Sequence, residues 1–272
     1  MKIGIQGIKG SFHHIAAEHY FGKNIDLVEC DTFGQMPNLL KEKKVDMLVM
    51  AIENSIAGAI LPNYALIDAC ELNICGESYL PIRHNLMALK GQKIAEIREV
   101  HSHPMALLQC QKFLKTLPHI KIVEDIDTAC VAKKIKEEKI KGVAAIASTL
   151  ASKLYELEIL ASDIQTININ ATRFFILNTS LNYTPEQADK ASVKFIANNE
   201  PGSLAEVLGI LSRYDLNLSK IQSLPIINTP WKYAFFVDFS FNNPTNYKEA
   251  IEEIKEKGVR LKILGLYIKS KS

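Results

Sequence analysis

The feature that most constrains the fold is the run at residues 45–52, "VDMLVMAI", which is apolar except for Asp46. A strand that buries one face alternates apolar and polar residues, whereas a nearly continuous apolar strand is typical of a parallel sheet covered on both faces. Parallel strands need long crossover connections, usually helices. A chain built around such a strand is therefore expected to supply helices between its strands.

The first 180 or so residues meet this expectation. Strand-like segments at 2–6, 25–30, 45–52, 99–102, 120–125 and 142–148 alternate with segments of helical periodicity at 11–21, 34–44, 56–69, 104–117 and 126–138. This order predicts an α/β fold with mostly parallel sheets. The segment at 77–91, "ESYLPIRHNLMALKG", breaks the alternation, and we expect it to be extended chain that crosses between two sublobes.

A different unit follows the polar stretch "NTSLNYTPEQADK", which contains Pro185, has no periodicity and predicts a linker. Residues 191–268 then give the order strand, helix, strand, strand, helix, strand. In a segment of this length, that order predicts a ferredoxin-like unit. The chain of 272 residues, 47% of them hydrophobic, is long enough for two such domains, each with its own core.

Composition excludes several classes of function. Lys and Arg number 32 against 30 Asp and Glu, so charge does not indicate nucleic-acid binding. The N-terminal sequence lacks the apolar core of a signal peptide, and no run approaches the roughly 18 apolar residues of a membrane span. The five cysteines form no CxxC pair and are expected to be buried free thiols. We expect a cytoplasmic protein without a membrane partner.

Polar groups at the ends of the predicted strands mark the candidate site, because ligands of α/β sheets bind there. In "GIQGIKGSFH", the spacing of Gly4, Gly7 and Gly10 is not the G-x-G-x-x-G pattern. The loop before the helix can present backbone N–H groups to an anion, but a tight structural turn explains it equally well. In "ENS", Glu53, Asn54 and Ser55 follow the apolar strand directly. Helix capping accounts for one of the three, and ligand binding is the alternative for the rest.

The stretch "HSHPMALLQC" begins a helix at Pro104, with Ser102 or His103 as the cap. Gln109 lies two turns beyond Ser102 on the same face, about 10 Å further along the axis. One helix edge therefore offers a hydroxyl and an amide. His101 and His103 have no third ligand near them in sequence, so a structural role is expected rather than metal binding.

In "INATRFFILN", Thr172 and Arg173 stand before the apolar strand residues 174–177. Arg173 suits a carboxylate, either of a ligand or of the fold itself. Thr172 suits hydrogen bonding to a ligand oxygen, or is an ordinary strand residue. No stretch indicates a redox cofactor, a phosphate loop or a nucleophilic triad. Together the four stretches indicate the binding and conversion of a small anion.

"ENS", "HSHPMALLQC" and "TRF", in this order and ahead of a ferredoxin-like unit, resemble the prephenate dehydratase family over essentially the whole chain. That family makes phenylpyruvate from prephenate on the way to L-phenylalanine. The resemblance implies a catalytic region of two α/β lobes, like a periplasmic binding protein, with the active site in the cleft. A ferredoxin-like ACT regulatory domain follows it. The implied boundaries are 1–181 for the catalytic region, 182–190 for the linker and 191–272 for the ACT domain. Lobe one would be about 1–78 plus 160–181, and lobe two about 79–159.

The motifs carry over residue by residue. The threonine of "TRF", Thr172, is the one tied most directly to catalysis, as the donor to the departing hydroxyl, with Asn54, Ser102 and Gln109 beside it. Arg173, Ser102 and the helix start after it, and the loop from Gly7 to Ser11, would hold carboxylates, while Asn54 and Gln109 would orient the ring. The further substrate contacts implied are Glu53, Ser55, Arg173, Phe174, Gly10 and Ser11. No metal and no organic cofactor is implied.

The chain departs from the family in two places. The first loop usually reads close to G-P-x-G-T-[FY]-S, and here Ser11 keeps a hydroxyl whereas His13 replaces a serine. In the ACT domain, the effector motif E-S-R-P becomes Gln222-Ser223-Leu224-Pro225, which removes a carboxylate and a fork of donors. The implied effector residues are Asn199, Pro201, Gly202, Ser203, Leu204, Gln222, Ser223 and Pro225.

The expected activity is the decarboxylating dehydration of prephenate by a hydro-lyase, regulated by L-phenylalanine through the ACT domain. The same chemistry on L-arogenate is one alternative, and a non-enzymatic amino-acid sensor is another. A sensor would have no need of the Thr172 hydroxyl. Because ACT units commonly pair edge to edge, a homodimer or homotetramer is expected.

Overall fold

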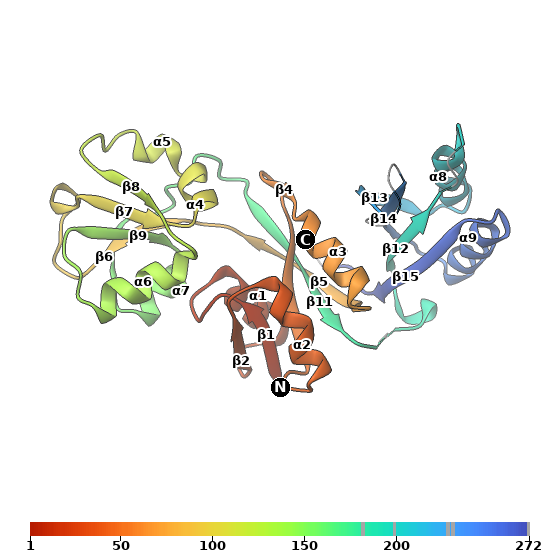
Figure 1. Ribbon diagram of the computed structural model, residues 1–272, viewed down its shortest axis with the longest axis horizontal. Coiled ribbons are helices and arrows are strands. Elements are labelled where there is room, and N and C mark those ends of the chain that lie inside the picture. Colours follow the sequence, from red (N-terminus) through yellow and green to blue (C-terminus); the bar gives the residue numbers. More distant parts are fainter. Residues whose placement is uncertain (181–182, 198–199, 227–228, 230–231, 271–272) are drawn as a thin grey trace. The chain divides into compact units, whose positions relative to one another are not determined.

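The computed structural model describes residues 1–180, 183–197, 200–226, 229 and 232–270. These fall into two compact units, Met1–Ile60 with Ser78–Phe174, and Leu61–Glu77 with Phe175–Ser272 (Figure 1). Within the described residues, no helix combines the length and apolar character needed to span a bilayer.

The first sheet has the order β2-β1-β3-β11-β5, with β4 paired to β3. Its strands are β1 (Lys2–Gln6), β2 (Asp26–Cys30), β3 (Met47–Asn54), β4 (Gly58–Ala59), β5 (Asn73–Pro81) and β11 (Ala171–Asn178). Strand β1 runs parallel to both β2 and β3. Every residue of 48–52 in β3 is at most 5% exposed, so the strand expected to be covered on both faces is covered. The helices that follow these strands are α1 (Phe12–Phe21), the 3₁₀ turn η1 (Phe33–Gln35) with α2 (Met36–Lys41), and α3 (Leu61–Ala69).

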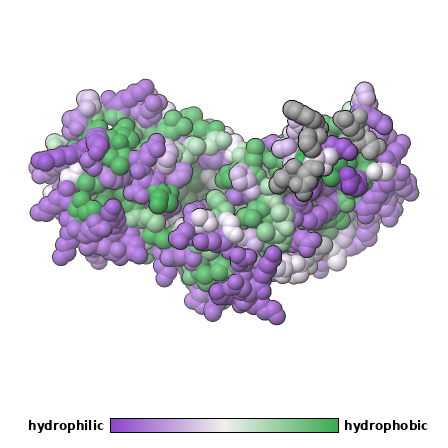
Figure 2. Space-filling model, in the orientation of Figure 1, coloured by the Kyte–Doolittle hydropathy of each residue, from purple (hydrophilic) through white to green (hydrophobic). Residues whose placement is uncertain are grey.

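The second sheet has the order β10-β6-β9-β7-β8 and belongs entirely to the first unit. Its strands are β6 (Asn85–Ala88), β7 (Glu99–Ser102), β8 (Lys121–Glu124), β9 (Val143–Ala147) and β10 (Glu158–Ala161). Strand β7 is parallel to β8 and β9, whereas β6 is antiparallel to β9 and β10. The accompanying helices are α4 (Pro104–Gln109), α5 (Gln111–Leu114), α6 (Thr128–Glu137), α7 (Thr149–Leu154) and the 3₁₀ turn η2 (Ile94–Glu96). On the face drawn in Figure 2, many hydrophilic residues lie around the elements of this second sheet.

Two sequence-based expectations of local structure need correction. The helix expected over 56–69 begins only at Leu61, because Gly58 and Ala59 form β4 and pair with the end of β3. The helix expected over 104–117 is interrupted at Cys110, whose backbone leaves helical geometry (φ −100°, ψ 10°). The segment 77–91 is largely extended, as expected, and carries the end of β5 and all of β6. Helix α7 and strand β10 were not expected at all.

The C-terminal residues form a four-stranded sheet of order β13-β14-β12-β15. The elements are β12 (Lys190–Ile196), α8 (Ser203–Arg213), β13 (Asn217–Pro225), β14 (Tyr233–Ser240), α9 (Pro244–Glu256) and β15 (Arg260–Tyr267), preceded by the 3₁₀ turn η3 (Pro185–Gln187). The predicted β-α-β-β-α-β order is confirmed. Both helices contribute apolar residues to one core with the sheet, including Val207, Leu211 and Ile251.

This C-terminal sheet packs tightly against α3 and the first half of β5, which belong to the same unit. A Cβ atom at Gly265 would lie 2.1 Å from the carbonyl oxygen of Ile74, so only glycine allows the two strands to approach this closely. The Tyr64 ring lies edge-on to Phe236 and to Phe175. Lys190 Nζ lies 2.9 Å from both carboxylate oxygens of Glu77, and these two residues are 6% and 3% exposed.

We predict that Lys190→Met destabilises the protein by about 3–5 kcal/mol, because it removes a cation that contacts both oxygens of the buried Glu77 carboxylate. Urea denaturation measures the change. The matched control is Lys257→Met, which removes a half-exposed lysine paired with Glu206 and should change the free energy of unfolding much less. Equal effects of the two substitutions would contradict the importance of the buried pair.

Candidate active site

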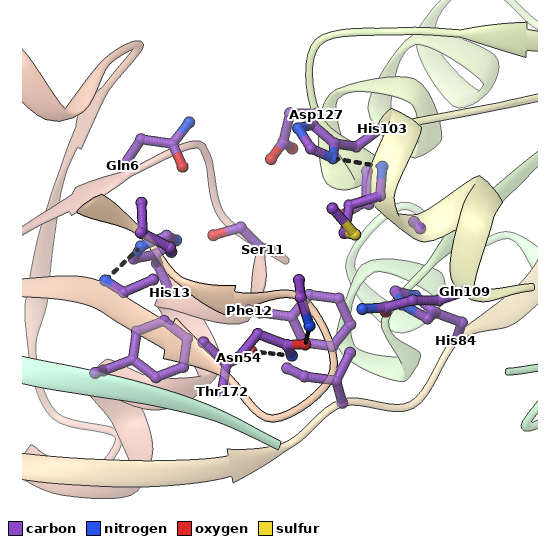
Figure 3. A pocket seen from close by; sticks show the side chains of 18 of the residues that line it. Gln6, Ser11, Phe12, His13, Asn54, His84, His103, Gln109, Asp127 and Thr172 are labelled. Atoms are coloured by element: carbon purple, nitrogen blue, oxygen red, sulfur yellow. Dashed lines mark hydrogen bonds between the residues drawn. The ribbon is translucent and has the colours of Figure 1, made fainter. Parts of the chain in front are cut away.

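A cavity of about 520 Å³ in the first unit collects side chains from both sheets. Thr172 and Phe174 come from β11, Asn54 from the end of β3, and Ser11 and His13 from the start of α1. From the side of the second sheet, His84 precedes β6. His103 caps α4, Gln109 is the last residue of that helix, and Asp127 caps α6. Figure 3 shows these side chains around the cavity.

The Asn54 side chain has only one amide orientation that satisfies its neighbours. Its Oδ1 accepts hydrogen bonds from the backbone N–H groups of Ile56 (3.0 Å) and Ala57 (2.9 Å). Its Nδ2 therefore faces Asn170 Oδ1 (2.7 Å), the carbonyl of Ala171 (3.3 Å) and Thr172 Oγ1 (3.0 Å). Backbone N–H groups can only donate, so the reversed amide would lose both bonds.

This orientation decides what the Thr172 hydroxyl can do. An amide nitrogen donates, so Thr172 Oγ1 accepts from Asn54, and the hydroxyl's own hydrogen remains to be donated elsewhere. Thr172 lines the cavity. The site thus holds a hydroxyl whose donor is available to a molecule bound in the cavity.

The same reasoning runs from Asn170 to His84. Asn170 Oδ1 accepts from Asn54, so Asn170 Nδ2 donates to Gln109 Oε1 at 2.9 Å. That oxygen also lies 2.9 Å from His84 Nε2, which must therefore carry the proton. Burial lowers the pKa of His84 and so favours the neutral ring. The hydrogen bond to Gln109 acts in the opposite direction and offsets part of this effect. With Gln109 Oε1 occupied twice, the Gln109 amide hydrogens are the groups left for a ligand.

His13 stands where the family loop has a serine, and it lines the cavity as a neutral ring. Its Nε2 accepts from the backbone N–H of Ala51 at 3.2 Å, so the ring proton is on Nδ1. The ring packs edge-on against Phe174, with centroids 5.0 Å apart. Burial lowers the pKa of His13 to about 3. His13 therefore offers a donor, not a base, near neutral pH.

The structure brings some of the predicted site residues together and places others elsewhere. Asn54, Gln109, Thr172, Phe174 and Ser11 line the cavity, although Ser11 Oγ is also the cap that accepts from His14 N–H. The remaining predicted residues are not in the cavity lining; they are Ser102, Glu53, Ser55, Arg173 and Gly10.

Three of these five residues have a local reason for their place outside the lining. Ser102 is fully buried and donates to the carbonyl of Ile146, while His103 is the cap of α4. Neighbouring residues of a strand face opposite sides, so Arg173 points away from the side that carries Thr172 and Phe174. Its guanidinium lies 5.8 Å from the centre of the Tyr79 ring, and Arg173 is 4% exposed. Ser55 holds the backbone of Ala171 through two hydrogen bonds.

Four residues of the site were not singled out from the sequence: Asn170, His84, Asp127 and His13 as a ligand-facing group. Asn170 lies two residues before Thr172, and a buried polar residue directly before a strand was the available signal. His84 and Asp127 come from loops of the second sheet, and nothing in their local sequence indicates that they line the same cavity as Thr172.

We predict that the free energy of unfolding falls as pH drops below about 6.5. The unfolded chain then takes up a proton at residue 13, whereas the folded chain does not until about pH 3. One such group accounts for about 2 kcal/mol between pH 6.5 and 5. His13→Gln should reduce this dependence, as measured by urea denaturation at the two pH values. An unchanged pH dependence in the variant would contradict the neutral state of His13.

Comparison with known proteins gives the class to which this fold and site belong. Residues 3–181 match the model of the prephenate dehydratase family, and residues 191–258 match that of the ACT domain. The chain belongs to the prephenate dehydratase family, whose activity is that of a hydro-lyase.

Two curated relatives cover nearly the whole chain. The bifunctional chorismate mutase/prephenate dehydratase of Buchnera aphidicola subsp. Acyrthosiphon pisum is 35% identical, over 96% of this chain and 69% of its own length. The chloroplastic arogenate dehydratase/prephenate dehydratase 2 of Arabidopsis thaliana is 34% identical, over 98% of this chain and 71% of its own length.

Solved structures share the fold. A protein described as GqqA, a novel type of quorum quenching acylase, superimposes with a TM-score of 0.89 at 28% identity, covering 99% of this chain and 98% of that one. Prephenate dehydratase from Arthrobacter aurescens in complex with L-Phe gives a TM-score of 0.83 at 24% identity, over 98% of this chain and 90% of that one. The predicted two-lobed α/β fold with an ACT domain is thus confirmed.

Proposed function

We propose that the cavity around Thr172 converts prephenate to phenylpyruvate in L-phenylalanine biosynthesis, with Thr172 as the group that acts on the leaving hydroxyl. The observation that carries this proposal is the hydrogen bond from Asn54 Nδ2 to Thr172 Oγ1, which leaves the threonine hydrogen free to donate. The role of the site in this reaction follows from the chemistry of the substrate.

Prephenate carries a ring carboxylate and, across the ring, a hydroxyl. The bond from the ring to the carboxylate breaks and releases CO2, its electron pair moves through the ring, and the carbon–oxygen bond to the hydroxyl breaks. The hydroxyl leaves with a proton as water, and the ring becomes aromatic. Aromatisation supplies the driving force, so the protein must hold the anion and stabilise a poor leaving group.

Thr172 meets the second requirement. A donor aimed at the atom where negative charge develops stabilises the transition state more than the ground state. The hydrogen bond from Asn54 makes the Thr172 hydroxyl a better donor, because chained hydrogen bonds polarise one another. The hydrogen bond from Asn54, which also bonds to Asn170, holds the threonine hydroxyl in position.

Neutral donors meet the first requirement, since none of the described residues that line the cavity is Lys or Arg. The start of α1 follows Ser11 there, and the first N–H groups of a helix lack partners within the helix. They form an anion site strengthened by the helix dipole. The Gln109 amide and His13 Nδ1–H add donors from the two sides of the cavity.

We predict that Thr172→Ala lowers kcat by about 100-fold or more, with a smaller change in KM, because it removes a donor that matters most in the transition state. Thr172→Ser keeps the hydroxyl and should retain much of the activity. Phenylpyruvate formation from prephenate is the measurement. Thr116→Ala, which removes an exposed hydroxyl on α5's C-terminal side, is the matched control. Near-normal turnover by Thr172→Ala would overturn the role of this residue.

Rival activities differ in what they ask of the site. L-arogenate undergoes the same ring chemistry, and side-by-side assays distinguish the two substrates. A non-enzymatic sensor would bind a ligand and turn over neither. The acylase described for one structural neighbour finds no support in the geometry: the cavity hydroxyls with described partners, Ser11 and Thr172, bond to a backbone N–H and to an amide, not to an imidazole.

For the rest of the chain, we assign residues 1–181 to the catalytic region, 182–190 to the linker and 191–272 to the ACT domain. Residues 181–182 lie outside the described residues, as does Asn199 of the implied effector set. We propose a cytoplasmic homodimer or homotetramer whose ACT domain binds L-phenylalanine. The bound L-Phe of the Arthrobacter aurescens protein supports this effector.

We predict that L-phenylalanine changes the rate of phenylpyruvate formation through the turn before α8. Gly202 there has φ +87°, a conformation that side chains with a Cβ rarely adopt, and Leu204 and Ser203 follow it. Gly202→Ala should therefore raise the half-effective concentration of L-phenylalanine several-fold without changing the uninhibited rate. D-phenylalanine serves as the ligand control. A rate unaffected by L-phenylalanine, or an unshifted response in the variant, would contradict the proposal.

A further inference from the structure

The cavity lining contains one charged side chain, Asp127, that has no part in the mechanism above. Asp127 and His103 lie at a distance from Thr172 and Asn54, on the other side of Ser11 (Figure 3). Among the described residues of this lining, Asp127 is the only Asp, Glu, Lys or Arg, and its carboxylate has the same sign of charge as the substrate.

Among the described residues, the backbone N–H groups that bond to the Asp127 carboxylate reach only one of its oxygens. Oδ1 accepts from the backbone N–H groups of Ala129 (2.8 Å) and Cys130 (3.0 Å), which caps α6. Oδ2 lies on the side of the first loop, since a Cβ atom at Gly7 would be 3.3 Å from it. Gly7 has φ +86°, so both its conformation and the nearby carboxylate favour glycine at that position.

The charge of Asp127 acts on two neighbouring side chains. Burial, followed by the charge of Asp127 and a hydrogen bond to its carboxylate, raises the pKa of the Cys130 thiol to about 11; Asp125 adds to this effect and Lys133 opposes it. The pKa of Tyr155 is raised to about 12 by burial and then by Glu29 and Asp127, among others. This end of the cavity therefore favours a cation over an anion.

The substrate's shape tells which of its groups would reach this end. The leaving hydroxyl and the C1 carbon lie across the ring from each other, so a hydroxyl held at Thr172 directs the C1 side chain away from Thr172. In prephenate that side chain is a keto acid. In arogenate it is an amino acid, with an α-ammonium group in place of the keto oxygen.

We propose that Asp127 is the specificity-determining residue for this side chain: its carboxylate binds the α-ammonium group of arogenate, so that the cavity accepts arogenate beside prephenate, whose keto acid gains no such bond. The inference rests on the proposed function, because it uses the same cavity and the same orientation of the ring. An ammonium group placed against a carboxylate forms a charge-assisted hydrogen bond, among the stronger kinds in proteins. A keto oxygen at the same place meets a like partial charge and gains no bond.

The test compares kcat/KM for prephenate and for arogenate in the wild type, Asp127→Asn and Asp125→Asn. Asn is as good a helix cap as Asp, so Asp127→Asn keeps the fold of α6 while removing the charge. We expect kcat/KM on arogenate to fall about 10- to 100-fold, mainly through KM, because the contact is remote from the breaking bonds. The value for prephenate should stay level or rise. Asp125→Asn removes the neighbouring carboxylate, which bonds to Ile126 N–H outside the cavity, and should leave the ratio within about twofold.

A ratio that Asp127→Asn leaves unchanged, a parallel loss on both substrates, or a wild type that turns over prephenate but not arogenate would overturn the inference and leave the proposed function standing. A wild type that turns over neither substrate would overturn the proposed function, and the inference with it. A shift of the ratio by Asp125→Asn as large as that by Asp127→Asn would show a general field effect and overturn the role of Asp127 as the contact.

Discussion

The orientation of one buried amide determines the chemistry of this site. Asn54 is held on one side by two backbone N–H groups of the turn between β3 and β4, which admit only its oxygen. Its nitrogen is thereby presented to three acceptors around the start of β11. Because the turn fixes the amide, the amide fixes the Thr172 hydroxyl as a donor toward the cavity. The backbone thus controls the direction of a side-chain proton on β11, the strand next to β3 in the sheet.

The effect extends to the second sheet through Asn170, Gln109 and His84. Each group in this series has its donor and acceptor sides assigned by the one before it, so the protonated nitrogen of His84 follows from the turn after β3. Such a series orients the polar groups of the cavity before any ligand arrives. It explains why a site without Lys or Arg in its lining can still be selective: its donors are fixed in number and direction.

The sequence predicted the fold class and the ACT topology because they depend on periodicity and order, which are local properties. It also indicated Thr172, Asn54 and Gln109, because polar residues at strand and helix ends are visible in a linear pattern. Local pattern could not tell which polar residues face the cavity. Strand alternation turns Arg173 away, and Ser102 is drawn to the carbonyl of Ile146 on a neighbouring strand.

The residues that the sequence did not indicate depend on tertiary structure. His84 and Asp127 enter the cavity from loops of the second sheet, and their position follows from how β6 and α6 are placed, not from neighbours in the chain. The late start of the helix after β3 has a similar cause. Gly58 and Ala59 pair with Asn54 and Glu53, a cross-strand contact that no helical periodicity reveals.

The packing of the C-terminal sheet on α3 and β5 has a consequence for any attempt to divide the chain. The division into compact units does not follow the catalytic and ACT segments of the sequence, because Leu61–Glu77 groups with the C-terminal residues. A fragment ending before Lys190 would keep Tyr64 and Glu77 but lose Phe236 and Lys190, which now cover them. It would expose the Tyr64 ring and remove Lys190 from the Glu77 carboxylate. The two segments match different families, yet Leu61–Glu77 of the catalytic segment belongs to the same compact unit as the ACT segment.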